Sequence, residues 1–208
     1  MTRPGKIVCI GRNYVAHARE LGNEVPERPL LFLKPPSAVI ADGDPIELPP
    51  ESARVEYEGE IGVVVGRRLR RASADEARAA VRGVAALNDV TARDLQRTDG
   101  QWTRAKGFDT FCPVGADAPA PADLAALTVV TRVNGEERQR GSAREMAFDI
   151  PTLLAYISGV MTLEPGDLIA TGTPVGVGIG FKPPKYLKAG DTVSVTIEPI
   201  GTLTNPVT

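Results

Sequence analysis

Short apolar runs, separated by turns that contain glycine and proline, recur along the whole chain. Runs of about four to eight apolar or alternating residues between such turns are typical of β-strands. We therefore predict strands at residues 7–10, 30–33, 45–49, 57–66, 84–90, 127–133, 136–139, 168–171 and 192–197. Asn134-Gly135 separates two of these strands and fits a two-residue type I′ turn, which predicts a β-hairpin.

Helical patterns are fewer and shorter than the strand patterns. We predict helices at 13–21 with Asn13 as N-cap, at 74–81 after a capping Ser73, and at 150–158, and either a helical turn or a loop at 91–96. Strands and helices do not alternate in the way that builds a doubly wound parallel sheet. The pattern predicts a β-rich α+β protein with an antiparallel or mixed sheet.

Composition and charge narrow the class of protein. A chain of 208 residues can bury a sizeable core, and its length suits one domain or a domain with an appendage; we expect a single domain over residues 1–208. Lys and Arg total 24 against 26 Asp and Glu, a balance that argues against a nucleic-acid binder. No apolar run approaches the ~18 residues of a membrane span. Without a secretory signal at the start, and with Cys9 and Cys112 expected as buried free thiols, we expect a cytoplasmic protein.

Three glutamates alternate along the predicted strand at 57–66 and just before it. Glu56, Glu58 and Glu60 would project from one side of an extended chain, where their charges repel one another. A divalent cation would relieve this repulsion, because hard cations prefer oxygen ligands. The alternative is an exposed strand face with Arg or Lys partners opposite.

Two further charged residues follow apolar segments. Asp89, at the end of the strand predicted at 84–90, is either a third oxygen ligand or a cap for the helical turn that follows. Lys106 lies among aromatic and glycine residues, and Lys106 or Arg93 would offset the repulsion between a carboxylate cluster and an anionic substrate. The alternative for Lys106 is an ordinary surface lysine.

His17 is the only histidine, and Glu20 lies three residues further on the same predicted helix. Residues with this spacing share one helical face, so the pair forms either a dyad able to deprotonate water or a surface pair without function. A glycine-rich turn at 171–178 offers amides and hydroxyls that would grip a carboxylate or an oxyanion, and a plain structural turn is the alternative. It lacks the lysine of a phosphate-binding P-loop.

Taken together, six phrases in this order closely resemble the fumarylacetoacetate hydrolase family. They are Gly11-Arg12-Asn13-Tyr14 with His17 and Glu20, Phe32-Leu33-Lys34-Pro35, Glu58-Gly59-Glu60-Ile61-Gly62, Asn88-Asp89-Val90-Thr91-Ala92-Arg93-Asp94-Leu95-Gln96, Lys106-Gly107-Phe108-Asp109 and Thr171-Gly172-Thr173-Pro174. The resemblance is to the short, single-domain branch that includes acylpyruvate hydrolases, oxaloacetate decarboxylases and isomerase/decarboxylases of aromatic catabolism. It implies a mixed β-sandwich roll of the family's C-terminal domain type, a homodimer, and Mg²⁺ or Mn²⁺ as cofactor, with Ca²⁺ as a further candidate.

The resemblance also implies a role for each matching residue. It assigns metal ligation to Glu58, Glu60 and Asp89, and leaves Glu56 as a neighbour. By the same resemblance the catalytic residues are Lys106, as a cationic stabiliser, and the dyad of His17 and Glu20, carried on a mobile lid segment at 12–28. The implied substrate-binding residues are Arg12, Arg93, Gln96, Gly172 and Thr173.

The implied activity is metal-dependent hydrolysis of a carbon–carbon bond in acylpyruvate-type 2,4-dioxo acids. The metal would chelate the 2-oxo and carboxylate oxygens of the substrate, and His17 with Glu20 would activate the attacking water. Decarboxylation of oxaloacetate needs the same enolate but no water. The alternative is an isomerase/decarboxylase acting on 2-hydroxyhepta-2,4-diene-1,7-dioate or 5-oxopent-3-ene-1,2,5-tricarboxylate. A fold that only binds a ligand is a further alternative.

Overall fold

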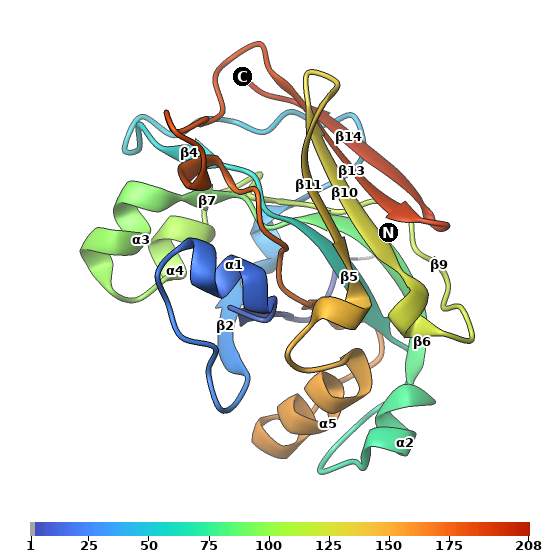
Figure 1. Ribbon diagram of the computed structural model, residues 1–208. Helices are drawn as coiled ribbons and strands as arrows, with labels where there is room; N and C mark the ends of the chain where they lie inside the picture. The colour runs from blue at the N-terminus through green and yellow to red at the C-terminus, as the bar shows by residue number, and fades with distance from the viewer. Residues whose placement is uncertain (1–2) are drawn as a thin grey trace.

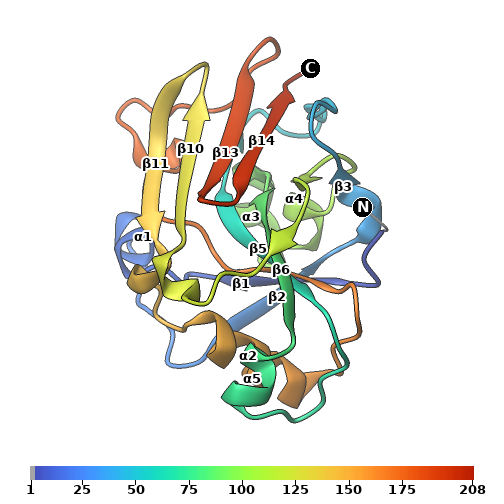
Figure 2. The ribbon, with the colours of Figure 1, turned by 90° about the vertical axis from the view of Figure 1, so that its right-hand side faces the viewer.

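Residues 3–208 are described by the computed structural model, and they form two β-sheets packed face to face with helices around them (Figure 1, Figure 2). The larger sheet has six strands in the order β2-β1-β12-β5-β6-β9, and it is mixed because β1 and β12 run parallel. The smaller sheet is antiparallel, with its four strands in the order β11-β10-β13-β14. The fold is therefore the strand-rich α+β sandwich that the sequence predicts.

The elements of the larger sheet are β1 Ile7–Gly11, β2 Leu30–Lys34, β5 Gly59–Val65, β6 Val81–Asn88, β9 Ala118–Pro119 and β12 Leu168–Ala170. Those of the smaller sheet are β10 Thr128–Val133, β11 Glu136–Ser142, β13 Thr192–Glu198 and β14 Gly201–Pro206. Two short pairs join β3 Val39–Ile40 to β8 Cys112–Pro113, and β4 Val55–Glu56 to β7 Thr91–Ala92. The α-helices are α1 Val15–Glu20, α2 Ala74–Arg78, α3 Arg93–Asp99, α4 Thr103–Lys106 and α5 Ile150–Val160.

The main core lies between the two sheets and is closed at one end by α5. Ile61 and Val63 of β5 pack in one apolar cluster with Val129 and Val195 of the smaller sheet, and all four are fully or almost fully buried. Val64 belongs to a second cluster on the opposite face of the larger sheet. Since successive strand residues point to opposite faces, Glu60 shares the outer face with Val64 and projects away from the main core.

Local sequence signals explain several boundaries. The β10–β11 hairpin turns at Asn134 and Gly135 with φ of 53° and 81°, which confirms the predicted type I′ turn. Ser73 caps α2 in a reciprocal capping box with Glu76, as the sequence indicates. The helix stops at Arg78, three residues before the predicted end, because Val81 already begins β6 beside β5. Tertiary pairing outweighs helix propensity here.

Other predictions are wrong in detail. Asn13 does not cap α1; its side-chain amide donates to the Phe148 and Thr171 carbonyls at 3.1 and 2.8 Å, and so ties this segment to distant loops. The sequence pattern missed α4, the two-residue strands β3, β8 and β9, and the longer strand β14. β14 contains glycine and proline, which disfavour strands, and it forms because it completes a hairpin with β13 at the edge of the smaller sheet.

The strand predicted at 57–66 begins two residues later than expected. Glu56 belongs to β4, which pairs with β7, and the longer strand β5 begins only at Gly59. Glu56 therefore separates from the other two glutamates. Cys9 and Cys112 are buried free thiols as predicted, and burial raises the pKa of Cys112 to about 12. Within residues 3–208 there is no helix with both the length and the apolar character to span a bilayer.

Candidate active site

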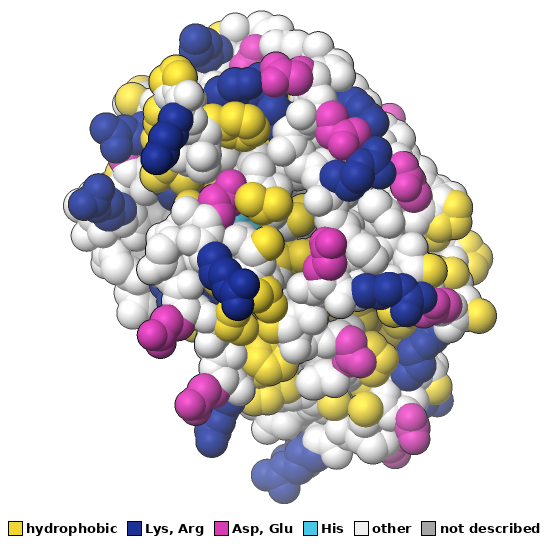
Figure 3. Space-filling model, in the orientation of Figure 1, with side chains coloured by type: hydrophobic (Ala, Val, Ile, Leu, Met, Phe, Trp, Pro, Cys, Tyr) yellow, Lys and Arg dark blue, Asp and Glu magenta, His cyan; other side chains and the backbone are white. Residues whose placement is uncertain are grey.

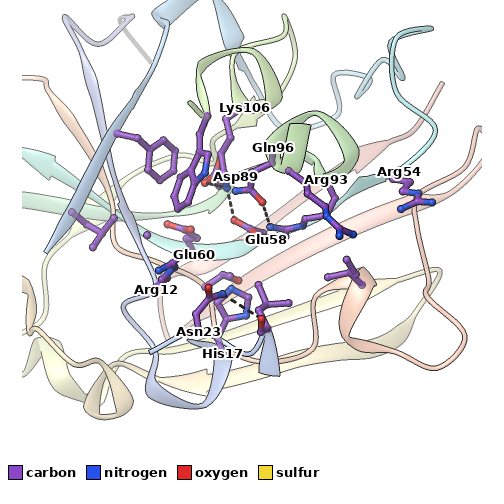
Figure 4. Close-up of a pocket in the computed structure, with 18 of the residues that line it drawn as sticks. Arg12, His17, Asn23, Arg54, Glu58, Glu60, Asp89, Arg93, Gln96 and Lys106 are labelled. Carbon is purple, nitrogen blue, oxygen red and sulfur yellow. Dashed lines mark hydrogen bonds and ion pairs between the residues drawn. The ribbon is translucent and has the colours of Figure 1, made fainter. Parts of the chain in front are cut away.

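A cavity of about 370 Å³ opens on the face of the molecule that carries α1, α3 and α4 (Figure 3, Figure 4). Its lining comes from β1, α1, the end of β6, α3, α4 and the loop after β12. The lining residues that the argument uses are Arg12, His17, Arg54, Glu58, Glu60, Asp89, Arg93, Gln96, Arg97, Trp102, Lys106 and Thr173. Most residues predicted for the site from the sequence thus meet around one cavity.

Strand pairing brings three acidic residues together at the bottom of this cavity. Antiparallel β5 and β6 place Gly59 opposite Asn88, so the residues flanking them, Glu58, Glu60 and Asp89, become neighbours. One carboxylate oxygen of each residue lies within 4.8 Å of the corresponding oxygens of the other two, and all three residues are at most 5% exposed. The sequence could place Glu58 and Glu60 on one strand; the pairing adds Asp89.

Buried cations surround these acids. Lys106 Nζ lies 2.6 Å from both Glu58 Oε2 and Asp89 Oδ2, and Arg93 Nη2 lies 2.5 Å from Glu58 Oε1. Lys34 Nζ lies 2.6 Å from Asp89 Oδ1. Lys106 is 2% exposed, so it is not the surface lysine of the alternative interpretation. The exposed strand face proposed for the glutamates is equally wrong, because their cationic partners are buried with them.

Asp89 is also not a helix cap. The residue at the N-cap of α3 is Ala92, which makes no side-chain cap hydrogen bond. Both Asp89 oxygens instead contact lysine ammonium groups, and the Asp89 amide donates to the Glu58 carbonyl at 2.8 Å. Its position directly after β6 places the Asp89 carboxylate beside Glu58 and Glu60.

The two glutamates of the cluster have opposite proton affinities. Burial opposes ionisation of Glu58, but the charges of Lys106 and Arg93 outweigh burial and lower its pKa below the usual value. Burial raises the pKa of Glu60 well above the usual value, and the negative charges of Asp89 and Glu58 raise it further. Glu60 meets only a neutral donor, the Gly172 amide, at 2.7 Å from Oε2. Within the acidic cluster of Glu58, Glu60 and Asp89, Glu60 is thus the member that no described Lys or Arg contacts.

This donor set fits a hard dication. Three carboxylates occupy part of an octahedral coordination sphere and leave positions for water or substrate, which suits Mg²⁺, Mn²⁺ or Ca²⁺. A carboxylate oxygen that accepts one hydrogen bond keeps a further lone pair, so the lysine contacts are compatible with ligation. Metal binding and the choice of ion stay predictions.

Glu56 has a different role from its neighbours. Its Oε1 pairs with Arg93 Nε, and its Oε2 accepts from the Ile179 amide at 2.6 Å. Arg93 therefore bridges Glu56 and Glu58, and its Nη1 also donates to Gln96 Oε1 at 2.5 Å. Arg93 and Gln96 reach the cavity as a linked pair whose orientation is fixed by these acids.

The predicted dyad lies on the opposite wall (Figure 4). His17 Nδ1 lies 3.1 Å from Glu20 Oε2, and Glu20 Oε1 accepts from the Gly176 amide at 3.0 Å. The bond to Glu20 leaves His17 Nε2 for a ligand, because the ring has two nitrogens. His17 is 5% exposed, which excludes a surface pair. The mobility of segment 12–28 stays a prediction.

The glycine-rich turn at 171–178 contacts the acidic cluster through a backbone amide. Gly172 has φ of 99°, and a Cβ there would lie 2.8 Å from Asn13, so the position needs glycine. Its amide is used by Glu60, whereas the side chain of Thr173 lines the cavity and donates to the Gly59 carbonyl at 2.9 Å. Of the two residues in this turn that were predicted to bind substrate, Thr173 lines the cavity. Gly172 instead donates its amide to Glu60, a predicted metal ligand.

Sequence reasoning missed four residues of the site. Arg54, Arg97 and Trp102 had no signal beyond their charge or size. Lys34 stood in the matching phrase Phe32-Leu33-Lys34-Pro35, but no role was assigned to it. Trp102 packs so closely on β1 that a Cβ at Gly11 would lie 2.7 Å from its ring. Arg12, which was predicted, follows β1 with φ of 58° and lines the cavity.

Known proteins resemble this chain in sequence and in overall fold. Oxaloacetate tautomerase YisK of Bacillus subtilis is 47% identical, and the alignment covers 99% of this chain and 70% of YisK. The structure of 5-carboxymethyl-2-hydroxymuconate delta-isomerase from Mycobacterium smegmatis has a TM-score of 0.89 at 47% identity, covering 99% of this chain and 79% of that one. The structure of 2-hydroxyhepta-2,4-diene-1,7-dioate isomerase from Mycobacterium marinum has a TM-score of 0.88 at 46% identity, with coverage of 99% and 75%.

The family model described as fumarylacetoacetate hydrolase C-terminal matches residues 6–208, almost the whole chain. The matched range includes the acidic cluster, the dyad and the glycine turn. Together with the sandwich fold, this match shows that the chain belongs to the fumarylacetoacetate hydrolase family, whose members include oxaloacetate tautomerases and hydroxymuconate isomerases.

Proposed function

We propose that this protein is a divalent-metal-dependent enzyme that interconverts the keto and enol forms of a 2-oxo dicarboxylic acid, with oxaloacetate as the smallest substrate. The observation that supports it is the joint position of Glu58, Glu60 and Asp89 beside Lys106 at the bottom of one cavity. Relatives named as oxaloacetate tautomerase and as isomerases of an unsaturated tricarboxylate and an unsaturated dicarboxylate support the same chemistry.

When bound, a dication polarises the 2-oxo group and so acidifies the neighbouring carbon–hydrogen bond. Glu58, Glu60 and Asp89 would hold it, with Mg²⁺ or Mn²⁺ as the expected ion. Burial disfavours the charged form of Lys106, but Asp89 and Glu58 outweigh burial and raise its pKa above the usual value. Lys106 therefore stays an ammonium group, which suits stabilisation of an enolate oxygen and does not suit a general base.

The proton is handled on the other wall of the cavity. In enolisation the carbon beside the 2-oxo group loses a proton and the oxygen gains one, so the reaction needs a group that accepts and returns a proton. His17, whose Nδ1 is held by Glu20, presents Nε2 for this transfer. Arg93 would orient the substrate carboxylate from the side.

A second candidate is hydrolysis of an acylpyruvate, and the dyad is the observation that favours it. His17 would take a proton from water, the water oxygen would bond to the distal carbonyl carbon, and the carbon–carbon bond would break with its electrons left on the pyruvate enolate. Protonation of the enolate carbon would then yield pyruvate and a carboxylic acid. Decarboxylation of oxaloacetate would use the same enolate without the water step.

One set of assays separates these reactions. We expect the Mn²⁺-loaded protein to accelerate loss of the ultraviolet absorbance of enol-oxaloacetate while malate dehydrogenase still recovers all the oxaloacetate. Lactate dehydrogenase detects pyruvate, so pyruvate from oxaloacetate indicates decarboxylation and pyruvate from acetylpyruvate indicates hydrolysis. Bound Mn²⁺ without turnover of either substrate would contradict the proposed function. The homodimer, the cytoplasmic location and the absence of nucleic-acid and membrane partners remain predictions.

A further inference from the structure

We propose that Arg54 and Arg97 form a subsite for a second carboxylate at the mouth of the cavity, and that this subsite selects 2-oxo dicarboxylates longer than oxaloacetate. The inference rests on the proposed function, because it assumes that the buried end of the cavity takes the 2-oxo acid group. It adds the substrate class and the two residues that would recognise it.

Both arginines are placed by the elements around Arg93. The Arg54 carbonyl accepts from the Arg93 amide at 2.9 Å, where β4 pairs with β7, and Arg97 lies one helical turn beyond Arg93 on α3. Both side chains line the cavity and both residues are exposed. In Figure 4, Arg54 lies on the far side of Arg93 from Glu58, toward the outside.

Neither guanidinium is neutralised by an acid. Among residues 3–208 no carboxylate oxygen lies within 4.0 Å of Arg54 or Arg97, whereas Arg104 in the next helix pairs with Asp99 at 2.6 Å. Asp94 also lines the cavity, but its oxygens accept from the Ser52 hydroxyl at 2.6 Å and from backbone amides. The guanidinium groups of Arg54 and Arg97 therefore leave the mouth of the cavity positively charged. Other Lys and Arg side chains lie on the surface around the mouth (Figure 3).

The charge balance of the paired groups at the buried end favours a second cationic site for a dianion. Four carboxylates, from Glu56, Glu58, Glu60 and Asp89, meet three cationic side chains there. The cationic side chains are Lys34, Arg93 and Lys106. A bound dication would leave this end with one unit of positive charge, which one substrate carboxylate neutralises. The second carboxylate of a longer substrate would need cations elsewhere, and Arg54 and Arg97 supply them.

The test uses two substrates of equal length that differ at one end. Succinylpyruvate ends in a carboxylate and butyrylpyruvate in a methyl group, and oxalate fills only the buried end. Dissociation constants of all three are measured by calorimetry on the Mn²⁺-loaded protein and on the Arg54→Gln, Arg97→Gln and double variants. Arg70→Gln is the matched control, because Arg70 is an exposed arginine in a turn after β5 and does not line the cavity.

We expect the parent to bind succinylpyruvate about 10-fold or more tightly than butyrylpyruvate, as charge-assisted contacts would give. The double variant should lose this preference while its affinities for butyrylpyruvate and oxalate stay unchanged. Equal affinity of the parent for succinylpyruvate and butyrylpyruvate overturns the inference. A double variant that still prefers succinylpyruvate overturns it as well, and so does a double variant that binds none of the three ligands. Enol turnover is measured in parallel. A preserved preference without turnover supports the subsite and contradicts the proposed function, so the two failures are distinguishable.

Discussion

Removal of the Lys34 ammonium group tests whether the buried charge network stabilises the fold. Lys34 is 2% exposed, and its Nζ donates to Asp89 Oδ1 at 2.6 Å and to the Val90 carbonyl at 3.2 Å. At an effective dielectric constant of about 20, two charges at this separation attract by about 6 kcal/mol. Burial of both groups opposes that attraction, and removal of one partner from a buried pair typically costs about 3–5 kcal/mol.

We therefore expect Lys34→Met to lower the free energy of unfolding by about 3–5 kcal/mol in metal-free buffer. Urea denaturation followed by circular dichroism measures this difference, with Lys188→Met as an exposed control that should change it by less than about 0.5 kcal/mol. Saturating Mn²⁺ should recover part of the loss, because a dication near Asp89 replaces the missing charge. A Lys34→Met protein within about 1 kcal/mol of the parent would refute the stabilising role of this pair.

Three further perturbations have defined outcomes. His17→Asn should abolish proton transfer, measured as enol turnover, while Mn²⁺ affinity measured by calorimetry stays that of the parent. Because the folded-state pKa of Glu60 is raised, the metal-free fold holds a proton that the unfolded chain releases, so stability should fall as pH rises from about 4.5 toward that raised pKa. Urea midpoints across pH should show this fall without Mn²⁺ and not with it. Gly59→Ala should lower the free energy of unfolding by about 1–3 kcal/mol, since the added Cβ would lie 1.9 Å from Thr131 Oγ1. Gly201→Ala, with open space, should leave the urea midpoint unchanged.

Much of the site was predictable because its acids lie on or beside strands. The two-residue spacing of Glu58 and Glu60 places them on one side of an extended segment, and Asp89 follows an apolar strand. The spacing of His17 and Glu20 likewise predicts the contact observed at 3.1 Å. These are local rules, so they hold before the fold is known.

What the sequence alone could not give depends on contacts between distant segments. Lys34 meets Asp89 across 55 positions, and no local pattern marks a lysine as buried. Glu56 leaves the acidic row only because β4 pairs with β7, and Asn13 gives up the helix cap for the carbonyls of Phe148 and Thr171. Burial, more than residue type, distinguishes Lys106 from an ordinary surface lysine.

Mn²⁺ binding to Glu60→Gln tests the central claim most directly. Glu60 is the best position, because substitution of Glu58 or Asp89 would also leave a buried lysine or arginine unpaired. Calorimetry should show affinity weakened by more than the ~10- to 100-fold that loss of an outer hydrogen-bond partner costs a metal site. The exposed control Glu47→Gln should bind as the parent does. If Glu60→Gln binds Mn²⁺ as tightly as the parent, the acidic cluster is not the metal site.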